Sequence, residues 1–151
     1  MSKLVRWTAP LALGAMSASA SAHVTIWPKQ SIAAAHEKYI VRVPNEKPVE
    51  MVALDVRFPA GLRVTSFEQK PGWMTEPIRD GSGQPVGVRW RGSLPPRQFA
   101  EFGLLAVNPA AAGDLVWNAV QTFADGSKAE WTGAAGSKTP APRVTITPVP
   151  R

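Results

Sequence analysis

The sequence predicts an all-β protein, an antiparallel β-sandwich of about eight strands. Several segments alternate between apolar and polar residues, which is the period-two pattern of a strand with one buried face. Turn signals built from glycine, proline and aspartate separate these segments at short intervals. No segment keeps the 3.6-residue period of an amphipathic helix over three turns. Together these observations favour two packed sheets over any helical architecture.

Residues 1–22 are predicted to be a secretory signal peptide. Lys3 and Arg6 form a basic start, residues 7–16 form a short apolar segment, and residues 20–22 (Ala-Ser-Ala) fit the small-x-small rule of signal peptidase. The apolar segment is shorter than the roughly 20 residues that cross a bilayer, so no membrane anchor is expected. Cleavage after the last of these residues predicts a periplasmic or secreted protein. An uncleaved tail, or cleavage two residues earlier, is the alternative.

The strands themselves follow from alternation and β-propensity. In "EKYIVRV" the residues Tyr39, Val41 and Val43 share one face, and in "VGVRW" the residues Val86, Val88 and Trp90 do the same. In "VEMVALDVRF" the shared face is predicted to hold Val52, Leu54, Val56 and Phe58. Two further segments are rich in β-branched or aromatic residues. The expected strands therefore include 37–43, 49–58, 86–90, 115–123 and 143–149.

Turns and loops complete a single domain over residues 23–151. Asp125-Gly126 separates two strand-like segments and predicts a hairpin, because both residue types tolerate positive φ. The segment 133–142, "GAAGSKTPAP", is expected to be a flexible loop or tether before the last strand. Nothing in the sequence indicates an internal repeat or a second domain.

Composition excludes several classes of function. The formal net charge is +6, but the basic residues are scattered, so nucleic-acid binding is not expected. The chain has no cysteine, which excludes a blue-copper site and zinc sites built on thiolates. Beyond the signal peptide only Met51 and Met74 remain, too few for a thioether-rich Cu(I) site. Metal sites built from nitrogen and oxygen donors stay open.

His23 is one of only two histidines and follows the predicted cleavage site directly. A histidine at a mature N-terminus offers its α-amine and its imidazole Nδ1 to one metal ion. An α-amine has a pKa of about 8, so a metal displaces its proton at little cost at neutral pH. Two nitrogens with a carboxylate and water suit Cu(II). An inert, exposed histidine is the alternative.

The mature start "AHVTIWPKQS" and the segments "KYIVRVPNEKP", "PGWMTEPI", "GVRWRGSLPPRQFAEFGLLAVNP" and "NAVQTFADGSKAEWTG" resemble the YcnI-like copper-binding domain family, formerly a domain of unknown function. The resemblance covers nearly the whole mature chain. It implies a cupredoxin/immunoglobulin-like β-sandwich that holds Cu(II) in a single-histidine brace, and a role in copper handling beside a copper chaperone or transporter.

Carried onto this chain, the resemblance assigns the amine and imidazole to His23, a carboxylate oxygen to Glu46 in "VPNE", and an indole at the open side to Trp131 in "AEWTG". His36 has no counterpart in the family pattern and is a possible secondary or intermolecular metal ligand. Without the family resemblance, Glu46 and His36 would be interpreted as solvated loop residues and Trp131 as a core residue.

The leading interpretation is an exported, non-enzymatic Cu(II)-binding protein that buffers or delivers copper. Two alternatives remain open. One is a copper enzyme that uses the brace to oxidise a polymer, for which only His36 is available as a second histidine. The other is a metal-free adhesion or carbohydrate-binding sandwich, which requires exposed tryptophans.

Overall fold

The computed structural model describes residues 22–151, so all but the last residue of the predicted signal peptide lies outside the described part. These residues form twelve strands, which are β1 (Thr25–Trp27), β2 (Gln30–Ile32), β3 (His36–Pro44), β4 (Met51–Arg57), β5 (Arg63–Phe67), β6 (Met74–Arg79), β7 (Pro85–Leu94), β8 (Phe99–Val107), β9 (Gly113–Val116), β10 (Asn118–Phe123), β11 (Lys128–Trp131) and β12 (Arg143–Thr147). Nothing in the described range is a helix long and apolar enough to span a membrane.

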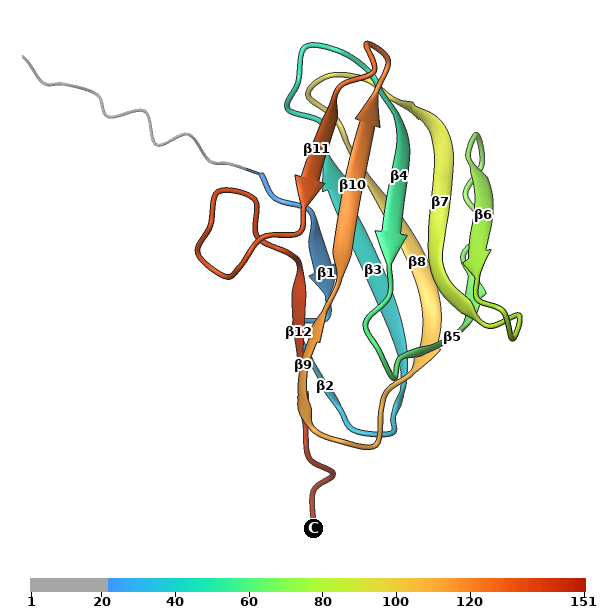
Figure 1. Ribbon diagram of the computed structural model, residues 1–151, viewed down its shortest axis with the longest axis vertical. Coiled ribbons are helices and arrows are strands. Elements are labelled where there is room, and N and C mark those ends of the chain that lie inside the picture. The colour runs from blue at the N-terminus through green and yellow to red at the C-terminus, as the bar shows by residue number, and fades with distance from the viewer. Residues whose placement is uncertain (1–21) are drawn as a thin grey trace, which may run out of the picture.

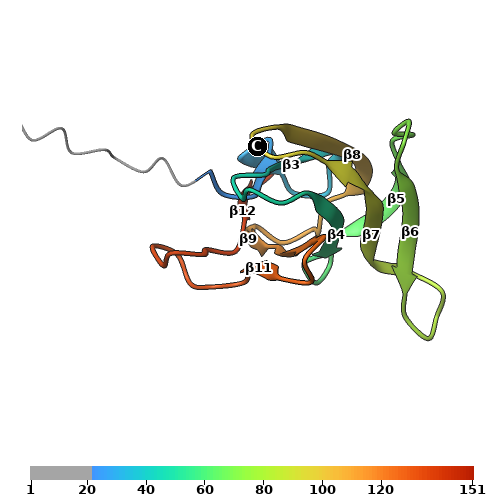
Figure 2. The same cartoon turned by 90° about the horizontal axis from the view of Figure 1, so that it is seen from above.

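Two main sheets pack face to face (Figures 1 and 2). One sheet has the strand order β1-β3-β8-β5 and the other the order β11-β10-β4-β7-β6. A small third sheet, β2-β12-β9, extends the sandwich at one end, and its β12–β2 pair is parallel while every other pair is antiparallel. The predicted class, an antiparallel β-sandwich, is confirmed. The structure has more strands than predicted, and six of the twelve are short, with three to five residues in β1, β2, β5, β9, β11 and β12.

Aromatic side chains from both sheets form the core. Trp90 on β7 stacks on Phe102 of β8 with ring centroids 4.6 Å apart, and this contact joins the two main sheets. Tyr39 on β3 meets Trp117 edge-on at 5.4 Å. The predicted alternation in β3 is confirmed, since Tyr39, Val41 and Val43 are all fully buried. Burial of such large apolar side chains is the main favourable contribution to folding.

The predicted face of β4 is correct only in part. Leu54 and Val56 are fully buried, but Val52 and Phe58 are only half-buried, and Met51 is buried instead. The β4–β10 register explains why Met51 is buried in place of Val52, because Thr122 and Phe123 pair with Ala53 and Met51 and leave Val52 as an extra residue. This β-bulge shifts the alternation by one position, which a period-two pattern alone does not reveal.

The hairpin predicted at Asp125-Gly126 joins β10 to β11. Gly126 has φ of 82°, and its N–H donates to the Phe123 carbonyl at 2.9 Å, so the loop is a tight turn followed by one left-handed glycine. Asp125 does not need positive φ here, and its carboxylate instead accepts the Ser127 N–H at 2.9 Å.

The loop 133–142 does not extend as a tether. Backbone hydrogen bonds from Gly133 to Thr139 and from Ala141 to Gly133, both 2.9 Å, fold it back on itself between β11 and β12.

Candidate metal centre

The sandwich brings the start of the described chain against a strand near its other end. Residues 22–24 lead into β1, the edge strand of the four-stranded sheet, and Trp131 ends β11, the edge strand of the five-stranded sheet. The imidazole of His23 and the indole of Trp131 meet with ring centroids 5.3 Å apart and ring planes at 65°. The two residues are therefore in edge-on aromatic contact across the gap between the sheets.

Glu46 reaches the same place from the loop after β3. Its Oε1 accepts a hydrogen bond from the backbone N–H of Ala22 at 3.0 Å. Ala22 directly precedes His23, and consecutive Cα atoms are about 3.8 Å apart. The carboxylate therefore lies within about one residue of the nitrogen that cleavage after Ala22 would convert into an α-amine.

The loop that carries Glu46 is held by its neighbour Asn45, which is only 1% exposed. The Asn45 side-chain amide donates to the carbonyls of Val49 and Leu94 at 2.8 and 2.9 Å, and its oxygen accepts the Lys47 N–H at 3.0 Å. Its backbone pairs with Gln98 and Arg97, each at 2.8 Å. Asn45 thus anchors the loop while Glu46 remains exposed beside it.

Trp131 is held from behind by Gln121 of β10, which is 2% exposed. The indole N–H donates to the Gln121 side-chain oxygen at 2.7 Å. The Gln121 amide nitrogen donates to the Pro44 carbonyl at 2.8 Å and lies 3.4 Å from the sulfur of Met51. The buried side-chain amide of Gln121, with both its oxygen and its nitrogen hydrogen-bonded, therefore links Trp131 to the end of β3, immediately before Asn45 and Glu46.

Asn45 and Gln121 are the residues that sequence reasoning missed. Gln121 had a visible signal, since it stands in phase with Ala119 and Phe123 at a core position of "NAVQTF". A polar residue at a core position needs a buried hydrogen-bond partner, so this position indicates a buried hydrogen bond. Asn45 directly precedes Glu46 in the sequence, but its role depends on bonds to the carbonyls of Val49 and of Leu94, the second of which is 49 residues away.

Ala22, Glu46 and Trp131 line one hollow of about 130 Å³, together with Gln121 and its neighbours. Within residues 22–151 no group of three or more histidine, cysteine, aspartate or glutamate side chains is arranged to hold a metal. The donors near this hollow are the carboxylate of Glu46, which lines it, and the imidazole of His23, which does not line it but contacts Trp131; cleavage after Ala22 would add an α-amine. Such a nitrogen and oxygen set fits Cu(II) and offers no soft ligand.

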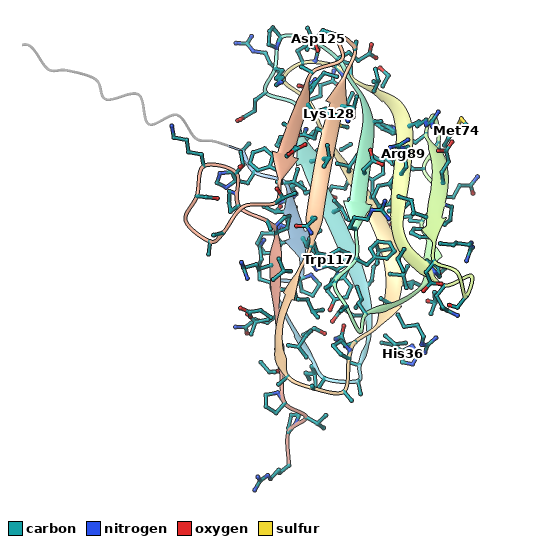
Figure 3. All side chains as sticks on the ribbon, in the orientation of Figure 1. His36, Met74, Arg89, Trp117, Asp125 and Lys128 are labelled. Atoms are coloured by element: carbon teal, nitrogen blue, oxygen red, sulfur yellow. The ribbon has the colours of Figure 1, made fainter. Side chains whose placement is uncertain are left out.

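His36 lies apart from this cluster. It is the exposed first residue of β3, whereas Glu46 lies two residues beyond Pro44, the last residue of the same strand. Eight residue steps along a strand span roughly 26 Å. Figure 3 shows His36 at the opposite end of the molecule from the Asp125 turn. Its predicted role as a secondary or intermolecular ligand therefore stays a prediction, separate from the His23 cluster.

The fold and the site define an immunoglobulin-like β-sandwich with a histidine, a glutamate and a tryptophan gathered where its N-terminal segment meets the last strand of the five-stranded sheet. The chain belongs to the family described as "Domain of unknown function (DUF1775)", which matches residues 23–146. The resemblance to the YcnI-like family is thereby confirmed.

Individual relatives agree with this assignment. The chain is 32% identical over 146 residues to the "Copper-binding protein CutI" of Bacillus subtilis (strain 168), covering 93% of this chain and 71% of that protein. It is similar to the crystal structure of an uncharacterized protein from Nocardia farcinica with an immunoglobulin-like fold (TM-score 0.70, 27% identity, 82% of this chain and 97% of that one). A cohesin module from a Clostridium perfringens family 33 glycoside hydrolase shares the fold alone (TM-score 0.54, 12% identity, 84% and 97% covered).

Proposed function

We propose that this chain is an exported protein that binds Cu(II) through an N-terminal histidine brace and buffers or delivers the metal. Residues 1–22 are removed as a signal peptide, and the domain 23–151 acts in the periplasm or outside the cell. The α-amine and the imidazole of His23 bind copper, and Glu46 supplies an oxygen ligand. A copper chaperone or transporter is the partner in exchange.

One observation carries the proposal. The Glu46 carboxylate accepts the N–H one residue before His23 at 3.0 Å, while the Trp131 ring lies 5.3 Å from the His23 ring. The three residues are far apart in sequence, and the fold brings them to one place. Two further facts support the proposal: the family match begins at His23, and the Bacillus relative is a copper-binding protein.

Each residue has a defined task in this proposal. The nitrogens of His23 that bind copper must be free of protons. Binding at neutral pH therefore displaces a proton from the amine. The Glu46 carboxylate compensates part of the positive charge of the ion. The Trp131 indole packs against the imidazole, restricts its rotation and limits the access of water.

Binding and exchange fit the described residues better than oxidative catalysis. An enzyme with a two-histidine brace needs a second imidazole at the metal, and His36 lies roughly 26 Å along β3 from the Glu46 loop. A metal-free adhesion module would need a platform of exposed tryptophans. Among residues 22–151, Trp27 is the one exposed tryptophan, at 41%.

The test compares two preparations, one that begins at His23 and one that begins at Ala22. Cu(II) is titrated into each and followed by calorimetry and electron paramagnetic resonance. We expect the first to bind one equivalent tightly with a nitrogen-rich tetragonal spectrum. We expect the second to differ in spectrum and affinity, because its amine is moved one residue and pairs with Glu46. Acetylation of the His23 amine is a further control and should abolish tight binding. Equal binding by all three preparations would refute the brace.

A further inference from the structure

His23 borders a hollow of about 280 Å³, separate from the one lined by Glu46 and Trp131, which we call the cationic hollow. Its walls come from the segment that begins at His23, from Lys29, from the folded-back loop between β11 and β12, and from Arg143 at the start of β12. The volume is suited to a small molecule or a single side chain and is too small for a helix.

The charges around this hollow are all of one sign. Lys29 and Arg143 line it, and no aspartate or glutamate does. In the part of the chain that the structure describes, neither cation is in an ion pair, whereas Lys38, Arg42, Arg89 and Arg91 each have a carboxylate partner. The hollow therefore has two cationic side chains without a carboxylate partner in its walls, beside His23; the Lys29 ammonium lies 4.9 Å from the centre of the Trp27 ring.

Two further details concern the cations of this hollow. The Nε of Arg143 is buried and has no hydrogen-bond partner among the described residues. A buried donor is normally paired with a protein group, an ordered water or a bound ion, so an anion that reached this nitrogen would gain a hydrogen bond. Burial and, secondly, the charge of Arg42 lower the pKa of Lys29, so the surroundings disfavour its positive charge and a bound anion would favour it.

Positive side chains beside a copper site repel the aqueous Cu(II) ion, but they attract a copper complex whose net charge is negative. We propose that the cationic hollow binds the carboxylates of a small anionic copper chelate, and that His23 takes its copper from that chelate; this rests on the proposed function of His23.

The transfer is a ligand exchange and involves no electron. Bonds from Cu(II) to the carboxylates of the chelate break, and bonds to the amine and imidazole of His23 and to Glu46 form. The proton that leaves the amine passes to the released carboxylate or to water. Lys29 and Arg143 hold the chelate during the exchange and do not bind the metal.

Carboxylate binding is tested first without copper, on the protein that begins at His23. Citrate is titrated by calorimetry at low and at high salt. We expect one saturable site that weakens as salt rises, since the interaction is between opposite charges. Lys29→Gln and Arg143→Gln should each weaken it several-fold, and the double variant should lose it. Arg63→Gln on β5, at the far edge of the sheet that begins with β1, removes the same charge and should stay within about twofold. No saturable binding, or an equal loss in Arg63→Gln, would overturn the proposal.

Copper transfer is then measured by stopped flow from two donors, anionic copper citrate and neutral copper bis-glycinate. The Lys29→Gln/Arg143→Gln double variant should load from citrate about tenfold more slowly and from bis-glycinate within about twofold of the unmodified protein. Equal slowing from both donors would overturn the proposal.

A second outcome is that citrate binds the hollow but the double variant takes copper from copper citrate as fast as the unmodified protein does. The carboxylate that the hollow binds then belongs to an acidic side chain of a partner, and the proposal of a small chelate is overturned. If the unmodified protein loads from neither donor, the proposed function of His23 fails together with the transfer step. The copper-free titration decides separately whether the hollow binds carboxylates.

Discussion

The indole N–H of Trp131 on β11 donates to the side-chain oxygen of Gln121 on the neighbouring strand β10 at 2.7 Å, and this bond is buried. The side-chain nitrogen of Gln121 also donates to the carbonyl of Pro44 at 2.8 Å, and Pro44 ends the strand that precedes Glu46. The aromatic wall of the candidate metal centre and the loop that carries its carboxylate are therefore joined by one buried amide.

Replacing Gln121 by leucine should disturb both the fold and the copper site. The substitution leaves the buried indole N–H and the Pro44 carbonyl without their partner, which we expect to lower the free energy of unfolding by about 2–3 kcal/mol. Urea unfolding measures this loss, and the copper spectrum should change because Trp131 is no longer held. Thr122→Val, on the next, half-buried position of the same strand, is the control and should have little effect on either. An unchanged spectrum in a folded Gln121→Leu protein would show that the amide does not position Trp131.

Replacing Asn45 by aspartate tests how the Glu46 loop is held. Aspartate keeps the acceptor for the Lys47 N–H but loses the two donated bonds to Val49 and Leu94. We expect a loss of about 1–3 kcal/mol in unfolding free energy and weaker Cu(II) binding, because the loop no longer presents Glu46 in one position. Thermal unfolding and copper calorimetry on the same sample separate the two effects. Unaltered copper affinity would mean that Asn45 has only a structural role.

Replacing Glu46 by glutamine should weaken Cu(II) binding by at least about tenfold and leave stability unchanged. The side chain is exposed, so its charge contributes to the metal and not to the core. Glu130→Gln, which removes an equally exposed carboxylate from β11, should leave the copper affinity as it is. If the two variants bind copper equally well, Glu46 is not a ligand.

Replacing Trp131 by phenylalanine should change both the copper spectrum and the stability. From the sequence alone, a change mainly in the spectrum is expected. The structure shows a side chain that is 8% exposed and part of the core, as well as in contact with His23. Loss of the bond to Gln121 should cost about 1–2 kcal/mol. Trp27→Phe, at an exposed tryptophan of β1, should leave the copper spectrum unchanged.

Lowering the pH from about 7 to about 5 should release copper, because protons compete with the metal for the amine and the imidazole of His23. The apparent affinity therefore falls as pH falls, and copper calorimetry at several pH values follows it. His36→Ala removes the other histidine and should leave this dependence as it is. An affinity independent of pH over this range would contradict an amine–imidazole site.

Much of the fold is local and can be predicted. The alternation of Tyr39, Val41 and Val43 is confirmed residue by residue, because a strand with one buried face repeats every two residues. Val52 shows the limit of this reasoning. Whether a residue is an extra one in a bulge depends on the register with β10, which is a property of two strands and not of one.

The sequence by itself determined the class of fold, the absence of cysteine ligands, and a histidine placed where cleavage would expose it. The tertiary structure alone decided that Glu46 and Trp131 lie beside that histidine while His36 does not. It also decided that Asn45 and Gln121 hold those residues in place. Alternation and composition are read within a few neighbouring residues, whereas a site is made of contacts between edges of two sheets. Such contacts exist only once the sheets have paired and packed.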